Sequence, residues 1–278
     1  MRWRIGIASG ACMEASILEA LPAVKRSGAT GVEIGTPPRH FNPMLPDQIA
    51  ALAGALRSQD LAAVSIHAPF GGRLDLADPN PHHRQDGVVA VRSAAAAIKA
   101  LGGRLVIVHP SDLRRDQHDV QARLDSSVDS LRLLGHDCEA EDITLVIESP
   151  LPHLIGGHPD EFGWILARLP ETTRVCLDTG HTSLGHHWRR FLEVAGDRLV
   201  HVHANDNHGH RDDHLPPGDG RIDWAEIART LDAVGFNGWM MLELKCPHED
   251  LGTYFTRAYA QTLRLFSDAL RQPGVSPS

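Results

Sequence analysis

The sequence predicts a single (β/α)8 barrel of the α/β class. Short apolar runs rich in Val, Ile and Leu alternate with longer amphipathic segments along the chain. Strands that alternate with helices at this spacing form parallel sheets through right-handed βαβ units. A second observation concerns six of the apolar runs, which lead directly into side chains able to bind a metal: His67, His109, Glu148, Asp178, His203 and Glu243. Because the C-terminal ends of all barrel strands meet at one mouth, these side chains would converge there.

Eight strands are expected, because parallel strands that are buried on both faces consist of nearly continuous apolar residues. In chain order they are Arg2–Ala8, Gly31–Ile34, Leu61–His67, Leu105–His109, Ile143–Glu148, Arg174–Asp178, Leu199–His203 and Trp239–Glu243. Open doubly wound sheets have the same alternation of strands and helices. No GxGxxG follows the first strand, however, and the candidate functional residues are spread over six strand ends instead of one switch point. Both facts favour the barrel.

Eight helices are expected between and after these strands. The second follows Pro46, which suits the first turn of a helix, and the third contains the strongly helix-forming run Ala94–Ala97. In chain order the helices are Glu14–Ser27, Asp47–Ser58, Arg84–Leu101, Val120–Leu134, Asp160–Leu169, Trp188–Val194, Trp224–Val234 and Gly252–Leu270.

Length and composition are typical of one large domain over residues 1–278. The chain is 42% hydrophobic and 22% charged, and no linker rich in Pro, Gly or Ser divides it. Without a membrane-length apolar stretch or a secretory segment, we expect a cytoplasmic protein. The formal net charge of −8 argues against a nucleic-acid partner, because phosphate backbones bind clustered Lys and Arg. The cysteines lack a CxxC spacing and are expected to be reduced thiols: Cys12, Cys138, Cys176 and Cys246.

Alternation along the strands predicts which side chains point into the barrel. Side chains two residues apart lie on the same face of a strand. By this rule Glu148 lies on the same face as Thr144 and Val146, and Asp178 lies on the same face as Cys176. We expect these faces to point into the barrel. His201 and His203 both point inward as well. His203 is nearer the mouth, so we expect it to be a ligand and His201 to be a deeper, hydrogen-bonded residue.

Two loops add candidate ligands. His181 follows Asp178 by three residues and is close enough to reach over the same mouth. A long polar segment, Asn205–Asp223, contains Asp212 and His214. Loops longer than about 12 residues in a compact domain usually carry function. We therefore expect this segment to be a lid or a binding loop.

Seven short motifs resemble one family. Their order and spacing are similar to those of the xylose-isomerase-like TIM barrel superfamily. It includes sugar and sugar-phosphate isomerases and epimerases, and also AP endonuclease family 2 (endonuclease IV). In chain order the motifs are HAPF, VIVHP, IES, LDTGH, HVHANDN, DDHLPPGDGRIDW and LELK. Since they extend over nearly the whole chain, the resemblance implies the same barrel and a metal site at its C-terminal mouth.

The resemblance also implies one to three divalent ions. The epimerase pattern of four ligands falls on Glu148, Asp178, His203 and Glu243. The endonuclease pattern adds further ligands for two more ions, namely His67, His109, His181, Asp212 and His214. A carboxylate-rich set suits Mn²⁺, Mg²⁺ or Co²⁺, whereas a histidine-rich set suits Zn²⁺.

By this resemblance the chain is an isomerase or epimerase of a sugar or sugar phosphate. It would act by proton transfer through a metal-bound enediolate, with Glu148 and Glu243 as the acid/base pair. We expect Glu33 to hydrogen-bond sugar hydroxyls. The cations expected to bind a phosphate or carboxylate of the substrate are Arg211, Arg221 and Lys245.

Two alternatives remain at this point. One is an endonuclease IV-like, zinc-dependent phosphoesterase that cleaves abasic DNA, because clustered metals favour phosphoester displacement. Against it, the segment Phe70–Arg73 lacks a bulky pair that could wedge into stacked bases, and the chain is acidic. The other alternative is a sugar lyase, a dehydratase or a non-catalytic sugar-binding barrel. The sequence does not fix the oligomeric state, and a homo-oligomer is compatible with it.

Overall fold

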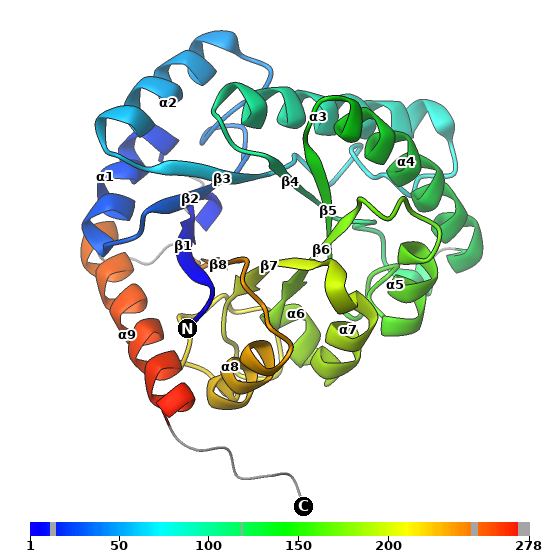
Figure 1. Cartoon of the computed structure of the whole chain (residues 1–278). Helices are drawn as coiled ribbons and strands as arrows, with labels where there is room; N and C mark the ends of the chain where they lie inside the picture. The colour runs from blue at the N-terminus through cyan, green and yellow to red at the C-terminus, as the bar shows by residue number, and fades with distance from the viewer. Residues whose placement is uncertain (12–14, 118, 246–249, 272–278) are drawn as a thin grey trace, which may run out of the picture.

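The structure is a computed structural model that describes residues 1–11, 15–117, 119–245 and 250–271. Eight parallel strands close into a barrel, in which each strand pairs with the next and β8 pairs with β1 (Figure 1). The strands are β1 Arg4–Ala8, β2 Gly31–Ile34, β3 Ala62–His67, β4 Leu105–Val108, β5 Thr144–Glu148, β6 Arg174–Asp178, β7 Leu199–Ala204 and β8 Trp239–Leu242. This closed order confirms the predicted (β/α)8 barrel and excludes the open doubly wound sheet.

Helices form a ring around the barrel (Figure 1). They are α1 Ile17–Ser27, α2 Pro46–Ser58, α3 Pro81–Ala100, α4 Val120–Ala140, α5 Pro159–Leu166, α6 Thr179–Leu184, α7 Trp188–Ala195, α8 Trp224–Ala233 and α9 Leu251–Arg271. Short 3-10 turns occupy Ser9–Ala11, Arg115–Gln117 and Gly196–Arg198. Most bounds lie within a few residues of those expected. The expected end of the fourth helix at Leu134 is wrong, because α4 continues to Ala140.

Local capping chemistry explains where several helices begin. The first helix was expected to start at Glu14, which lies outside the described residues, but α1 begins at Ile17. Ser16 caps it, and the Glu19 side chain accepts a hydrogen bond from the Ser16 backbone N–H at 2.8 Å. Proline, whose fixed φ suits the first turn, opens three other helices: Pro46, Pro81 and Pro159.

The main apolar core lies between the barrel and its helices. Its largest fully buried side chains include Phe162, Phe191, Phe255 and Phe266. Burying a side chain of this size contributes roughly 1.5–3 kcal/mol. Within the described residues, no helix is long and apolar enough to cross a membrane. Of the cysteines, Cys138 and Cys176 are buried free thiols, as expected, and Cys12 and Cys246 lie outside the described residues.

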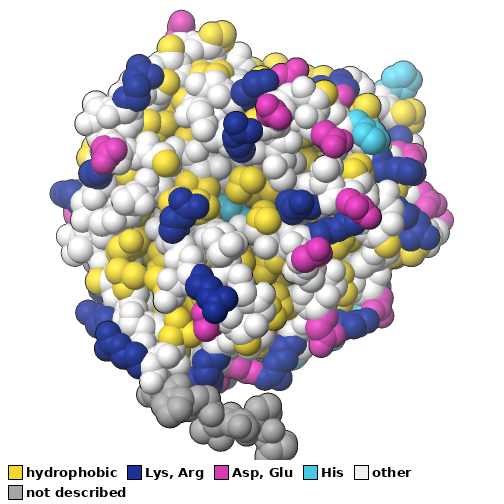
Figure 2. Space-filling model, viewed as in Figure 1, with side chains coloured by type: hydrophobic (Ala, Val, Ile, Leu, Met, Phe, Trp, Pro, Cys, Tyr) yellow, Lys and Arg dark blue, Asp and Glu magenta, His cyan; other side chains and the backbone are white. Residues whose placement is uncertain are grey.

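The lower half of the barrel lumen is filled by large side chains that lie opposite glycines. A Cβ atom on Gly31 would lie 2.5 Å from the Trp239 ring, and one on Gly6 would lie 2.4 Å from the Met241 Sδ. The Arg4 guanidinium lies over the Trp239 ring at 4.5 Å. Figure 2 shows the face on which the chain begins, with hydrophobic side chains near the barrel axis and Lys and Arg side chains around them. Side-chain packing therefore closes this end of the barrel.

Two glycines provide a matched test of this packing. Gly31→Ala should lower the free energy of unfolding by about 1–3 kcal/mol, because its methyl group would overpack the lumen. Gly54, inside α2, has no atom within 4 Å of an added Cβ. Gly54→Ala should therefore raise stability by about 0.5–1 kcal/mol through helix propensity. Urea denaturation of both variants measures the difference, and a Gly31→Ala protein as stable as the parent would contradict this account of the packing.

Candidate metal centre

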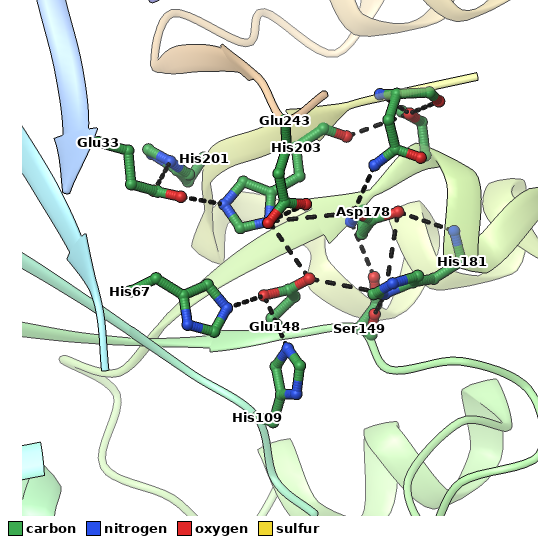
Figure 3. A network of polar contacts seen from close by, with 12 residues as sticks. Glu33, His67, His109, Glu148, Ser149, Asp178, His181, His201, His203 and Glu243 are labelled. Atoms are coloured by element: carbon green, nitrogen blue, oxygen red, sulfur yellow. Dashed lines mark hydrogen bonds and ion pairs between the residues drawn. The ribbon is translucent and has the colours of Figure 1, made fainter. Parts of the chain in front are cut away.

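Eight of the nine candidate ligands lie at the C-terminal ends of strands or in the loops that follow, and His181 lies in the short helix α6 after β6. Glu148 and Asp178 are the last residues of β5 and β6, and His203 lies near the end of β7. The side chains form three adjoining clusters, and the ligand atoms of each cluster lie within 4.8 Å of one another. The clusters are His67, His109 and Glu148; Glu148, Asp178, His203 and Glu243; and His181, Asp212 and His214. Figure 3 shows how the first two clusters share Glu148.

The central cluster gathers three carboxylates around one imidazole. The Nδ1 atom of His203 lies 3.2 Å from Glu148 Oε1, 3.4 Å from Glu243 Oε2 and 3.9 Å from an oxygen of Asp178. Glu148 and Asp178 are almost completely buried, whereas the Glu243 side chain is 21% exposed. Burial, with the nearby charges of Glu243 and Glu148, raises the pKa of Asp178 to about 7. Carboxylates that are buried this close together repel one another, and a proton on one of them, a charged imidazole or a bound cation relieves the repulsion.

The second cluster places two imidazoles on the other oxygen of Glu148. The Nε2 atoms of His67 and His109 lie 3.1 Å and 3.3 Å from Glu148 Oε2. Although burial acts in the opposite direction, His203 and His109 hold the pKa of Glu148 well below its usual range. Glu148 is therefore ionised and contacts imidazoles on both of its oxygens.

The third cluster joins α6 to the long loop before α8. Asp212 Oδ2 lies 3.4 Å from His181 Nε2 and 2.8 Å from His214 Nε2. Although burial lowers the pKa of His181, Asp178 and Asp212 raise it to about 9. For His214, burial again opposes the shift, and Asp212 and Glu243 raise its pKa to about 10. Both histidines would therefore be positively charged at neutral pH, with a proton on each ring nitrogen, until a cation displaces one of these protons.

Each of the five histidines has an acceptor near its other ring nitrogen, which is a hydrogen-bond partner in four cases and the ion-pair partner Glu33 in the case of His203. The distances are 3.1 Å for His67 to the Ala68 carbonyl, 2.7 Å for His109 to Asp112, 3.0 Å for His181 to the Ser149 carbonyl, 2.9 Å for His203 to Glu33 and 2.9 Å for His214 to the Glu243 carbonyl. Because each acceptor favours an N–H on the nitrogen that faces it, the inward nitrogen can offer a lone pair toward the carboxylates once it has lost its own proton. Histidines that bind metals have this arrangement, so the residues fit divalent cations.

A short helix that sequence analysis missed positions His181. The Asp178 carboxylate caps α6, because one of its oxygens accepts a hydrogen bond from the His181 backbone N–H at 2.7 Å. Its other oxygen accepts a hydrogen bond from the Asn205 side-chain amide at 2.9 Å. A Cβ atom on Gly180 would lie 1.8 Å from Asn205 Oδ1. The sequence Asp-Thr-Gly-His contains the signal, since Asp is a favoured N-cap residue.

Asp206 organises the loop that carries Asp212 and His214. Its carboxylate accepts four hydrogen bonds, from the backbone of Asn207, Gly218 and Ile222 and from the Trp224 indole, at 2.8–3.1 Å. Antiparallel backbone hydrogen bonds also link Asp206 and Leu215. The expected binding loop is therefore tied to the barrel along its length. Sequence analysis missed Asp206, although a carboxylate directly after a buried strand was a usable signal.

The four expected substrate-binding residues lie in two different environments. Glu33 is 1% exposed and contacts Ser65, His201 and His203. His201 is fully buried, which agrees with the deeper position expected for it. The three cations are exposed outside the clusters: Arg211, Arg221 and Lys245. Arg211 pairs with Asp213, and the backbone N–H of Lys245 donates to the His214 carbonyl at 2.9 Å.

Comparisons with known proteins agree with the barrel fold. The family model described as xylose isomerase-like TIM barrel matches residues 21–268. A D-psicose 3-epimerase of Ruminiclostridium cellulolyticum is 24% identical over 243 residues, covering 83% of this chain and 78% of the relative. A protein of Sinorhizobium fredii is 28% identical over 276 residues, covering 90% and 88%. The crystal structure of a D-tagatose 3-epimerase-like protein superposes with a TM-score of 0.83 at 22% identity, covering 96% and 97%.

The raised pKa values predict how metal binding depends on pH. In the metal-free protein, protonated His181 and His214 stabilise the fold fully below the unfolded pKa of about 6.5. This contribution is lost as the pH rises through folded values of about 9 and 10. Because a cation competes with these protons, the gain in Tm on adding Zn²⁺ should be larger at pH 8.5 than at pH 6.5. Asp212→Asn should remove most of this difference. Equal gains at both pH values would contradict the prediction.

Proposed function

Because this chain belongs to the xylose isomerase-like TIM barrel family, we propose that it is a sugar isomerase or epimerase that depends on a divalent metal. The central cluster is the observation that carries the proposal. Its four ligand atoms converge at the C-terminal mouth of the barrel, where active sites of this fold lie. The relatives named D-psicose 3-epimerase and D-tagatose 3-epimerase-like protein support the same class.

The donor set suits the chemistry of moving a proton beside a carbonyl group. A divalent ion bound there would polarise the carbonyl and offset the negative charge that develops when the neighbouring carbon loses its proton. Three carboxylates and one imidazole favour Mn²⁺, Mg²⁺ or Co²⁺, and the histidine-rich third cluster favours Zn²⁺.

The surroundings of Glu148 and Glu243 suggest which role each glutamate has in proton transfer. Glu148 is 1% exposed and contacts His67, His109 and His203, so its carboxylate is held in place from several sides. Glu243 is more accessible, because its side chain is 21% exposed. We therefore assign to Glu243 the removal of a proton from the substrate. We assign the opposite face of the substrate to Glu148, since epimerisation removes a proton from one face and returns one to the other.

Exposed cations outside the clusters are proposed to anchor the distal part of the substrate. Arg221 and Lys245 are exposed, and each is held by a backbone hydrogen bond to the loop before α8. Arg211 is 83% exposed and pairs with Asp213. A phosphate on the sugar would bind to such side chains, and a free sugar would not need them.

Proton exchange with solvent tests the proposed reaction. With Mn²⁺ and a panel of ketoses and ketose phosphates in deuterated water, the parent protein should introduce deuterium beside the carbonyl, detected by mass spectrometry. Glu243→Gln should abolish exchange, because the amide cannot accept a proton, and it should lower the metal content less than Glu148→Gln, since Glu243 belongs to one cluster only. Glu148→Gln should abolish exchange and also lower the metal content, since two clusters share its carboxylate.

The control for this experiment is Lys245→Ala, which should mainly raise KM for a phosphorylated substrate and leave kcat unchanged. No exchange by the parent on any ketose would refute an isomerase or epimerase acting by proton transfer.

A second candidate function is a zinc-dependent phosphoesterase of the endonuclease IV type. The observation that favours this function is the convergence of all nine candidate ligands into three clusters. A proton-transfer enzyme needs fewer metal ions than three clusters could hold. Elemental analysis of protein purified without chelator would count about three metal ions per chain in this case. The protein should then cleave abasic DNA with a steep dependence on salt. One tightly bound ion and no cleavage would exclude this candidate.

A further inference from the structure

A buried carboxylate lies directly behind the central cluster. Glu33 Oε2 accepts hydrogen bonds from Ser65 at 2.7 Å and from His201 at 2.9 Å. Its other oxygen lies 2.9 Å from His203 Nε2. Glu33, Ser65, His201 and His203 are each no more than 1% exposed. Figure 3 shows Glu33 on the side of His203 that faces away from Glu148 and Glu243.

Irregular strand pairing places Glu33 in this position. The register between β2 and β3 shifts at Val32/Glu33, so that Glu33 pairs with Ser65. A second shift, between β6 and β7 at Val175/Cys176, aligns Cys176 with His201. Such irregularities change the direction of a side chain at a defined position, often beside active sites. Together they let a residue of β2 reach across the lumen to the histidines of β7.

His203 differs from the other four histidines in the ring nitrogen that faces the carboxylates. It presents Nδ1, whereas His67, His109, His181 and His214 present Nε2. The contact between His203 Nε2 and Glu33 accounts for this difference. A carboxylate at 2.9 Å favours a proton on that nitrogen and so leaves the Nδ1 lone pair free for a cation.

We propose that Glu33 is a positioning residue for the central divalent ion, which it holds in place through His203. This inference rests on the metal centre of the proposed function. Glu33 fixes the tautomer and the ring orientation of His203, and its negative charge makes the imidazole a stronger donor. His201 and Ser65 in turn fix the Glu33 carboxylate. This assignment differs from the sugar-binding role expected from the sequence. Both oxygens of Glu33 already have partners, and His203 lies between Glu33 and the carboxylates of the central cluster.

Metal titration without sugar tests the proposal. Calorimetric titration of the metal-free protein with Mn²⁺ should show about 10- to 100-fold weaker binding of the central ion in Glu33→Gln. Ser65→Ala, which removes one donor to the same carboxylate, should weaken binding in the same direction by a smaller factor. With Co²⁺, the visible absorption spectrum should change in Glu33→Gln, because His203 no longer holds one orientation. Asp178→Asn, which removes a ligand, identifies the signals of the central ion.

Asp112→Asn is the matched control, because Asp112 binds His109 in the way that Glu33 binds His203. It should leave the affinity and the Co²⁺ spectrum of the central ion unchanged. Circular dichroism of each metal-free variant checks the fold, and if Glu33→Gln does not fold, Ser65→Ala provides the comparison.

Two results would separate the failure of this inference from the failure of the proposed function. The positioning role is wrong if folded Glu33→Gln and Ser65→Ala bind the central ion with the affinity and the Co²⁺ spectrum of the parent. If only KM for the sugar rises in these variants, the sugar-binding role expected from the sequence is restored. If the parent protein itself binds neither Mn²⁺ nor Co²⁺, the metal centre is absent and the proposed function fails with it.

Discussion

Repulsion among buried carboxylates is the physical constraint on which this structure depends. Glu148, Asp178 and Glu243 approach one imidazole inside a barrel that largely excludes water. In a medium of low dielectric constant such charges cannot remain together without compensation. The barrel strands hold them there nonetheless, because their backbones are fixed by hydrogen bonds to two neighbours each. The fold thus imposes on these groups an arrangement that needs compensating positive charge, from protonated histidines or from a bound cation.

The remainder of the architecture maintains that arrangement. Trp239 and Met241 fill the lower lumen, so the polar groups are confined to the upper end of the barrel. Asp206 ties the long loop to the barrel through backbone amides and the Trp224 indole. Each histidine is fixed by an acceptor behind it, and these acceptors come from strands, loops and the backbone alike. Rigid support of this kind holds ligand side chains in the geometry that a metal requires.

The fold and the convergence of the six residues at strand ends were predictable from rules that act along the chain, and the resemblance to the family added His181, Asp212 and His214. Apolar runs indicate strands, alternation gives the inward face, and parallel strands bring their C-terminal ends together. The surroundings of Glu33 were not predictable in this way. Its partners come from β3 and β7, and a shift of register at Glu33 alters its alignment with β3. Contacts across the lumen leave no periodic signal in a single sequence.

The sharing of Glu148 between two clusters has a consequence for how ions fill the site. Two ions held by one carboxylate divide its single negative charge, and they also repel each other across a few ångströms. The second ion would therefore bind more weakly than the first. By thermodynamic reciprocity it would weaken the first to the same degree. Metal binding would be negatively cooperative and would occur in separate steps as the free metal concentration rises. The protein would then carry fewer ions when metal is scarce than when metal is abundant.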